Sequence, residues 1–187
     1  MVTAQEIGTL EQDSNAAFVR ALYLLDRAKL EGFLDPVRFP NGINSLTVPA
    51  NALTVAVGTK LTKLDFQPKS CTYNESRGRD ANGYYYDVQF VTEFPKDRYD
   101  VVSWARDTQF EEYVALWEDF NGTAYLTGTD EIGLEVQLTR TIAGRNVSTV
   151  SIAGRLVTPT YYLESIDLAE LFPEADFSFH FSLGFNA

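Results

Sequence analysis

Apolar and polar residues alternate along most of this chain, and a period of two is the signature of β-strands. The clearest case runs from Tyr84 to Phe94, where Tyr84, Tyr86, Val88, Phe90 and Phe94 share one face. The opposite face is mainly polar, which predicts a half-buried strand. The same alternation recurs in shorter segments that begin near Leu61, Cys71, Leu134 and Val150.

Three further segments predict strands with more apolar surface. Phe18 to Leu25 is almost wholly apolar; its periodicity fits a strand or a helix, and we favour the strand. Glu112 to Glu118 is apolar on both faces, so we expect it to be covered on both sides. Near the C-terminus, Phe177 to Phe185 places four phenylalanines and Leu183 on one face. That face must pack on the chain's own core or on a neighbouring subunit, because exposed it would promote aggregation.

Turn residues separate these strands. The polar segment from Asn74 to Gly83 predicts a loop at the tip of a long, protruding hairpin. Asn121-Gly122 is a strong hairpin signal, and Ala143 to Asn146 predicts another turn. Residues 30–58 are broken by proline and glycine and predict a long connection, with short strands around Ser45–Val48 and Leu53–Val57.

One α-helix is expected, over residues 97–106. Asp97 is the expected N-cap, with Asp100 three residues later in a loose capping box. Tyr99, Val102 and Ala105 form the expected apolar stripe, flanked by Val101 and Trp104. A short helical turn is also expected from Ile166 to Phe172.

The predicted fold is therefore mainly β: an antiparallel β-sandwich or barrel with one flanking α-helix, a long hairpin and an extended N-terminal arm. Residues 1–15 are polar and predict a mobile arm. Residues 16–187 predict a single sandwich domain, with a C-terminal strand extension at 164–187.

Charge adds one feature to this picture. The chain has a formal net charge of −11, so its field repels nucleic-acid phosphates. Its one basic cluster, Arg77-Gly78-Arg79, lies on the predicted hairpin tip. It is either a solvated loop or an arm that reaches an acidic patch on a neighbour, which would favour head-to-tail self-association.

Candidate catalytic chemistry is sparse. The single cysteine, Cys71, and the single histidine, His180, exclude a cysteine-based metal cluster and give no catalytic motif. Acid pairs occur at Glu111-Glu112, Glu118-Asp119 and Asp130-Glu131, beside turns or strand ends where acids are normally solvated. The oxygen-rich segments 119–121 and 129–131 lack EF-hand spacing.

We therefore expect no enzyme activity, no cofactor and no metal. The N-terminus lacks the apolar core of a signal peptide, and no apolar run approaches the ~20 residues of a membrane span. These features predict a protein that is made in a cytoplasm, stays soluble and has no membrane partner.

Two motifs carry a family resemblance. Glu118–Gly128 reads EDFNGTAYLTG, and Thr149–Pro159 reads TVSIAGRLVTP. With the preceding strand and helix, this order resembles tail tube and related structural proteins of long-tailed bacteriophages, especially those of Bacteroidetes hosts. The resemblance covers about residues 16–163.

The resemblance implies stacked homo-hexameric rings, in which sheets of neighbouring β-sandwiches join into an inner barrel. DNA would pass through an acidic lumen without adhering, and the partners would be copies of the chain and other tail proteins. The protein would be made in the host cytoplasm and reside in the tail of the virion. Candidate self-assembly contacts are Arg77, Gly78, Arg79, Asp80, Tyr85, Phe177, Phe179 and Phe181.

Two other functions remain open at this point. One, within the same class, is a tail terminator, completion or baseplate-hub protein. The other is a carbohydrate-binding β-sandwich that uses Trp104, Trp117 or the tyrosines of Tyr84–Tyr86 as stacking platforms.

Overall fold

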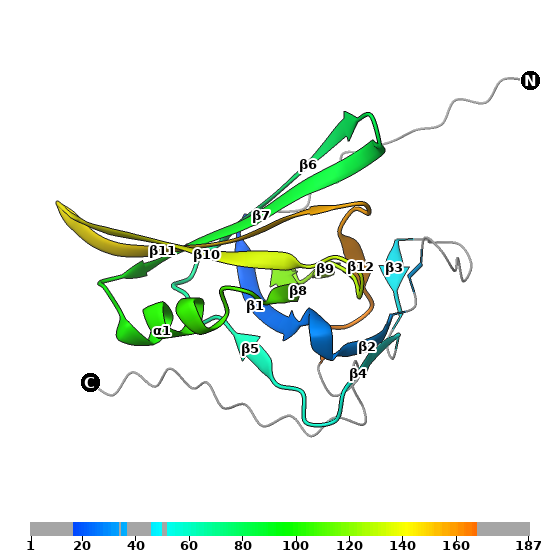
Figure 1. Ribbon diagram of the computed structural model, residues 1–187, viewed down its shortest axis with the longest axis horizontal. Helices are drawn as coiled ribbons and strands as arrows, with labels where there is room; N and C mark the ends of the chain where they lie inside the picture. The colour runs from blue at the N-terminus through cyan, green and yellow to red at the C-terminus, as the bar shows by residue number, and fades with distance from the viewer. Residues whose placement is uncertain (1–16, 34, 37–45, 50–51, 168–187) are drawn as a thin grey trace, which may run out of the picture.

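The chain folds into a mainly β structure with one α-helix, which confirms the predicted fold class (Figure 1). The computed structural model describes residues 17–33, 35–36, 46–49 and 52–167. In chain order the elements are β1 (Val19–Asp26), the 3-10 turn η1 (Arg27–Lys29), β2 (Leu30–Phe33), β3 (Thr47–Val48), β4 (Leu53–Val55), β5 (Leu61–Lys63), β6 (Thr72–Asp80), β7 (Gly83–Pro95), α1 (Tyr99–Asp107), β8 (Glu112–Asp119), β9 (Ala124–Thr127), β10 (Leu134–Ala143), β11 (Arg145–Leu156) and β12 (Tyr161–Leu163).

The longest strands form one layer, in the order β10-β11-β7-β6, which we call the long layer. Every neighbouring pair in it is antiparallel. The two hairpins are offset: the last pair between β7 and β11 at one end joins Tyr86 to Leu156, so the β6–β7 tip projects beyond β11. The β10–β11 tip projects in the opposite direction (Figure 1).

The remaining strands of the main sheet form a second layer around β8. β8 pairs with β1 on one side and β9 on the other, and the order continues through β12 to β3. The layers are joined at Leu134 and Glu135, which pair with β8. The backbone segments at Gly133 and Gly154 approach so closely here that a Cβ on Gly154 would lie 2.9 Å from the carbonyl oxygen of Gly133.

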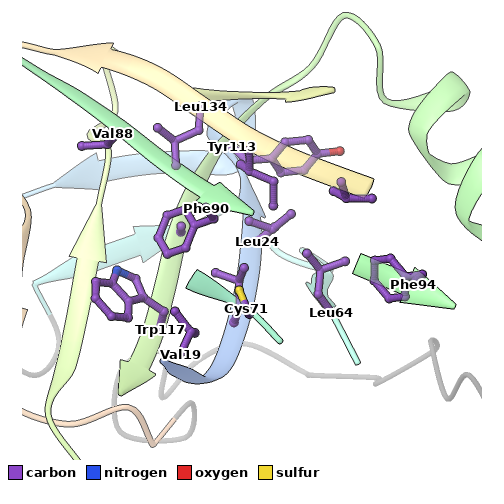
Figure 2. Close-up of a cluster of buried hydrophobic side chains, with 14 of the residues drawn as sticks. Val19, Leu24, Leu64, Cys71, Val88, Phe90, Phe94, Tyr113, Trp117 and Leu134 are labelled. Carbon is purple, nitrogen blue, oxygen red and sulfur yellow. The ribbon is translucent and has the colours of Figure 1, made fainter. Parts of the chain in front are cut away.

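The main core lies between these layers. It gathers buried side chains from β1, β7, β8, β11 and α1, and Figure 2 shows several of them pointing toward one another. Cys71 is fully buried here, which raises the pKa of its thiol to about 12. A second core, built on Leu25, Leu53, Leu116, Leu126 and Tyr161, covers the other face of β8.

Strand β8 separates the two cores, as its two apolar faces predict. Tyr113, Ala115 and Trp117 point into the main core, while Val114 and Leu116 point into the second. Residues 113–117 are all buried. The small sheet of β2 and β4 supplies part of the second core, and β2 falls within the segment predicted as a long connection.

Helix α1 corrects two expectations. Its N-cap is Arg98, without a side-chain cap hydrogen bond, because Asp97 instead pairs with Arg140 of β10. The buried residues are Val101 and Ala105, while Tyr99 is 84% exposed rather than part of the apolar stripe. The helix therefore packs on the main core through one narrow side.

The predicted loop from Asn74 to Gly83 is also wrong. β6 extends to Asp80 and pairs with β7 as far as Gly83, so the turn itself is confined to Ala81 and Asn82. The predicted arm 1–15 and the strand Phe177–Phe185 lie outside the described residues. Most of the helical turn expected at Ile166–Phe172 lies outside them too.

Candidate assembly surface

One face of the long layer is covered by the main core, and the other carries small polar side chains. Registered strand pairs place these side chains in rows, for example Asn74 beside Gln89 and Gln89 beside Ala153. The polar face comprises Thr72, Asn74, Ser76, Asp87, Gln89, Val91, Glu93, Glu135, Gln137, Thr139, Thr149, Ser151, Ala153 and Arg155. Among these named residues there is no lysine, and Arg155 is the one arginine.

The polar face is also concave. A hollow of about 550 Å³ lies over β6, β7, β10 and β11 beside the junction with β8. Hydrogen bonds span it, including one from Gln89 Nε2 to Ser151 Oγ at 2.9 Å. Asp87 accepts from Arg155 Nε at 2.8 Å, so the positive charge on this face is matched. Glu135 adds a negative charge to this surface.

Both outer strands of the long layer have an edge that no strand of the described chain pairs with. On one side this is β6, over its full length of nine residues. On the other it is β10 from Val136 to Ala143, since β10 meets β8 only at its first two residues. Neither strand contains proline or lysine, the residues that natural proteins often place on edges to prevent pairing.

The hairpin tip is held by contacts across the polar face. Gly78 lies opposite Tyr85, and a Cβ at Gly78 would overlap the Tyr85 ring, so the missing side chain makes room for it. The guanidinium of Arg155 lies 4.0 Å from the centroid of that ring. This arrangement joins β6, β7 and β11 at the base of the projecting tip.

Replacing Gly78 by alanine is expected to displace the Tyr85 ring and destabilise the protein by about 0.5–1.5 kcal/mol, mainly through the lost stacking on Arg155. A double-mutant cycle with Tyr85→Ala, measured by urea denaturation, tests this directly. In the Tyr85→Ala background the cost of Gly78→Ala should nearly vanish. An equal cost in both backgrounds would show that the ring is not the reason.

On the opposite side of the tip, Arg77 and Arg79 flank Tyr84. Each guanidinium lies 5.3 Å from the centroid of the Tyr84 ring, within cation–π range. Both arginine side chains are exposed, and Tyr84 is 58% exposed. Asp80 accepts a hydrogen bond from the backbone N–H of Asn82 and so fixes the turn. The structure therefore gathers Arg77, Gly78, Arg79, Asp80 and Tyr85 on one hairpin.

The other predicted contacts, Phe177, Phe179 and Phe181, lie outside the described residues, as does His180. Sequence reasoning identified the basic tip from its composition. It did not identify the polar face or the two open edges, because these depend on which strands become neighbours. The matched alternation of Asn74, Gln89 and Gln137 was the available signal.

The acid pairs Glu111-Glu112 and Glu118-Asp119 have structural partners. Glu111 accepts a hydrogen bond from the Tyr113 hydroxyl. The pKa of Tyr113 is raised, mainly because the side chain is buried and secondly because of this hydrogen bond. Glu112 pairs with Arg27 at 2.7 Å, and Glu118 pairs with Arg20 at 3.2 Å. Asp119 accepts hydrogen bonds from the backbone N–H groups of residues 121 and 123 and so organises the turn.

Two of the aromatic residues considered for carbohydrate stacking do not form an open platform. Trp117 is 5% exposed and stacks on Tyr125, with ring centroids 4.2 Å apart inside the protein. Trp104 packs, partly buried, against the main core. Of the tyrosines, Tyr84 is the most exposed, but the two arginines already contact its ring.

Among the described residues, no group of three or more histidine, cysteine, aspartate or glutamate side chains is placed to hold a metal ion. None of the helices in the described part is long and apolar enough to cross a membrane. Comparison of the chain with protein-family models, with curated proteins and with solved structures found no match.

Proposed function

We propose that this protein is a structural subunit of a bacteriophage virion that assembles into homo-hexameric rings, and that it serves as a tail tube subunit. The observation that carries the proposal is the long layer, with a core-facing side, a polar concave side and two open edges. The sequence motifs at Glu118–Gly128 and Thr149–Pro159 supply the resemblance to tail tube proteins.

The open edges support ring formation because their directions are compatible. Neighbours in the order β10-β11-β7-β6 alternate in direction, so β6 and β10 run opposite to each other. In a ring of copies related by rotation, β6 of one subunit would therefore meet β10 of the next in antiparallel orientation. Such pairing satisfies backbone groups that would otherwise remain open, and it closes without free edges.

The polar face supports a lumen for DNA. If edges join with the core-facing side outward, the faces of all copies form one inner wall of amides, hydroxyls and carboxylates. Its positive charge at Arg155 is matched by Asp87, while Glu135 repels phosphates. A duplex passing through would meet few groups that could hold it.

The test is the assembly state of the purified full-length chain. Mass photometry and cryo-electron microscopy at increasing concentration should give six-subunit rings that stack into tubes. A chain that stays monomeric at about millimolar concentration would contradict the proposal. Copy number in a virion separates a tube subunit, present in hundreds of copies, from a terminator or hub protein, present in about one ring.

A further inference from the structure

Most arginines of the described chain are neutralised by a carboxylate of the same chain. The ion pairs are Arg20–Glu118, Arg27–Glu112, Arg98–Asp100, Arg106–Asp107, Arg140–Asp97 and Arg155–Asp87. Among the arginine side chains that the structure describes, Arg77 and Arg79 have no carboxylate within ion-pair distance. Because the chain has a net charge of −11, two neighbouring arginines without a carboxylate partner indicate a binding surface for an acidic ligand.

The acids nearest in sequence are held elsewhere. Glu75 accepts hydrogen bonds from the Tyr73 hydroxyl at 2.7 Å and from the backbone N–H of Thr160 at 3.0 Å. Asp80 fixes the hairpin turn, and Asp87 pairs with Arg155 on the polar face. The two guanidinium groups therefore remain on one side of a projecting tip, both contacting Tyr84, with donors free for an acidic ligand.

The chain itself contains a segment of matching chemistry. Residues 168–178, LAELFPEADFS, carry Glu170, Glu174 and Asp176 and no basic residue. Before residue 168 the chain runs from the base of the β6–β7 hairpin, at Thr160, along β9. Thr160 contacts Glu75, but β12 then runs along β9 until Leu163 pairs with Ala124.

We propose that the Arg77–Arg79 pair binds the acidic segment 168–178 of a second copy, with the guanidinium groups donating to its carboxylates and Tyr84 contacting its apolar side chains. One basic tip and one acidic segment per copy make a head-to-tail contact, which can repeat along an assembly. This contact adds an inter-subunit link to the proposed ring subunit, but it is testable without rings.

A labelled synthetic peptide of residues 168–178 tests the contact by fluorescence anisotropy with the full-length protein. We expect saturable binding that weakens as ionic strength rises, because exposed charge pairs are screened. Arg77→Glu/Arg79→Glu should weaken it by roughly tenfold or more. The variant Arg106→Glu/Lys60→Glu makes the same change in net charge at exposed sites elsewhere and should bind as the wild type does.

Reversal of both partners completes the test. A peptide with lysine at positions 170, 174 and 176 should bind the Arg77→Glu/Arg79→Glu protein and not the wild type. At concentrations where the wild-type chain is monomeric, no peptide binding to it, or equal binding to both double variants, would overturn the proposal. So would equal binding of a peptide of residues 1–13, which is acidic but differs in sequence. A chain that forms rings at high concentration but binds no peptide as a monomer would overturn this inference alone. Peptide binding by a chain that never forms rings would leave the inference standing and contradict the proposed function.

Discussion

Replacing Trp117 by alanine is expected to lower the free energy of unfolding by about 3–5 kcal/mol. Trp117 is 5% exposed and lies in the main core between the two layers. Its ring packs against Tyr73, Phe90 and Tyr125, with centroid separations of 4.5, 5.5 and 4.2 Å. Its Nε1 donates to Thr127 Oγ1 at 3.0 Å, so truncation removes both a hydrogen bond and several aromatic contacts.

Such a loss is a large share of the stability of a typical domain, which is about 5–15 kcal/mol. Urea denaturation should be followed by far-UV circular dichroism, because the substitution also removes a fluorophore. Phe110→Ala provides the control: this side chain is 91% exposed, and its removal should change stability by no more than about 0.5 kcal/mol. A change below about 1 kcal/mol for Trp117→Ala would contradict its place in the core.

The same prediction bears on the carbohydrate-binding alternative. Because Trp117 is buried, loss of glycan binding in Trp117→Ala would report unfolding rather than a lost stacking platform. Tyr84 is the better probe for that function, since it is exposed and its removal leaves the core intact. A glycan-array signal that survives Tyr84→Ala would count against the hairpin tip as the binding surface.

Sequence periodicity located the strands that have a buried face. Val88, Phe90 and Phe94 alternate with polar residues because one side of β7 meets the core, and the pattern records that contact. The segment Asn74–Asp80 resembles a loop for the converse reason. Its outer residues, Gly78–Asp80, lie beyond the last β7–β11 pair, so neither face there meets the core, and pairing with β7 keeps them extended.

The helix shows how tertiary contacts override local signals. Asp97 is a good N-cap residue by type, but Arg140 lies within reach on β10, and the ion pair takes the carboxylate away from the helix. Spacing alone places Tyr99 in the apolar stripe. The core contacts only the side of α1 that bears Val101 and Ala105, which sequence spacing could not specify.

Part of the candidate assembly surface can be predicted from the sequence, and part depends on the fold. The basic tip is visible in the sequence because Arg77 and Arg79 stand out in an acidic chain. The polar face is not, because Asn74, Gln89 and Gln137 resemble any solvent-facing residues until the register aligns them. Open edges are a property of topology: β10 has one because its pairing with β8 is confined to Leu134 and Glu135.

Blocking one edge of the long layer at a time is expected to convert an assembling chain into a monomer. Asn74→Lys/Ser76→Lys places lysines on β6, and Thr139→Lys/Thr141→Lys places them on β10. All these side chains are exposed, so each variant should fold with stability within about 0.5 kcal/mol per substitution. Lysine on an edge strand hinders the addition of another strand.

The mixture of the two variants gives the sharper result. The β6-blocked chain keeps an open β10 edge, and the β10-blocked chain keeps an open β6 edge, so an equimolar mixture can form one joint. Analytical ultracentrifugation should show monomers for each variant alone and a dimer, with no larger species, for the mixture. Gln109→Lys/Phe110→Lys adds the same charge in an exposed loop and should assemble like the wild type.

This pattern of outcomes identifies which surfaces meet. An interface between two copies of the same patch would be blocked in one variant and unaffected in the other, and mixing would change nothing. A heterologous interface between β6 and β10 requires both edges, so neither variant assembles alone. In the mixture, one variant supplies an open β10 edge and the other an open β6 edge. If both variants still formed rings, the subunits would have to meet through other surfaces, and the polar face would no longer be expected to line a lumen.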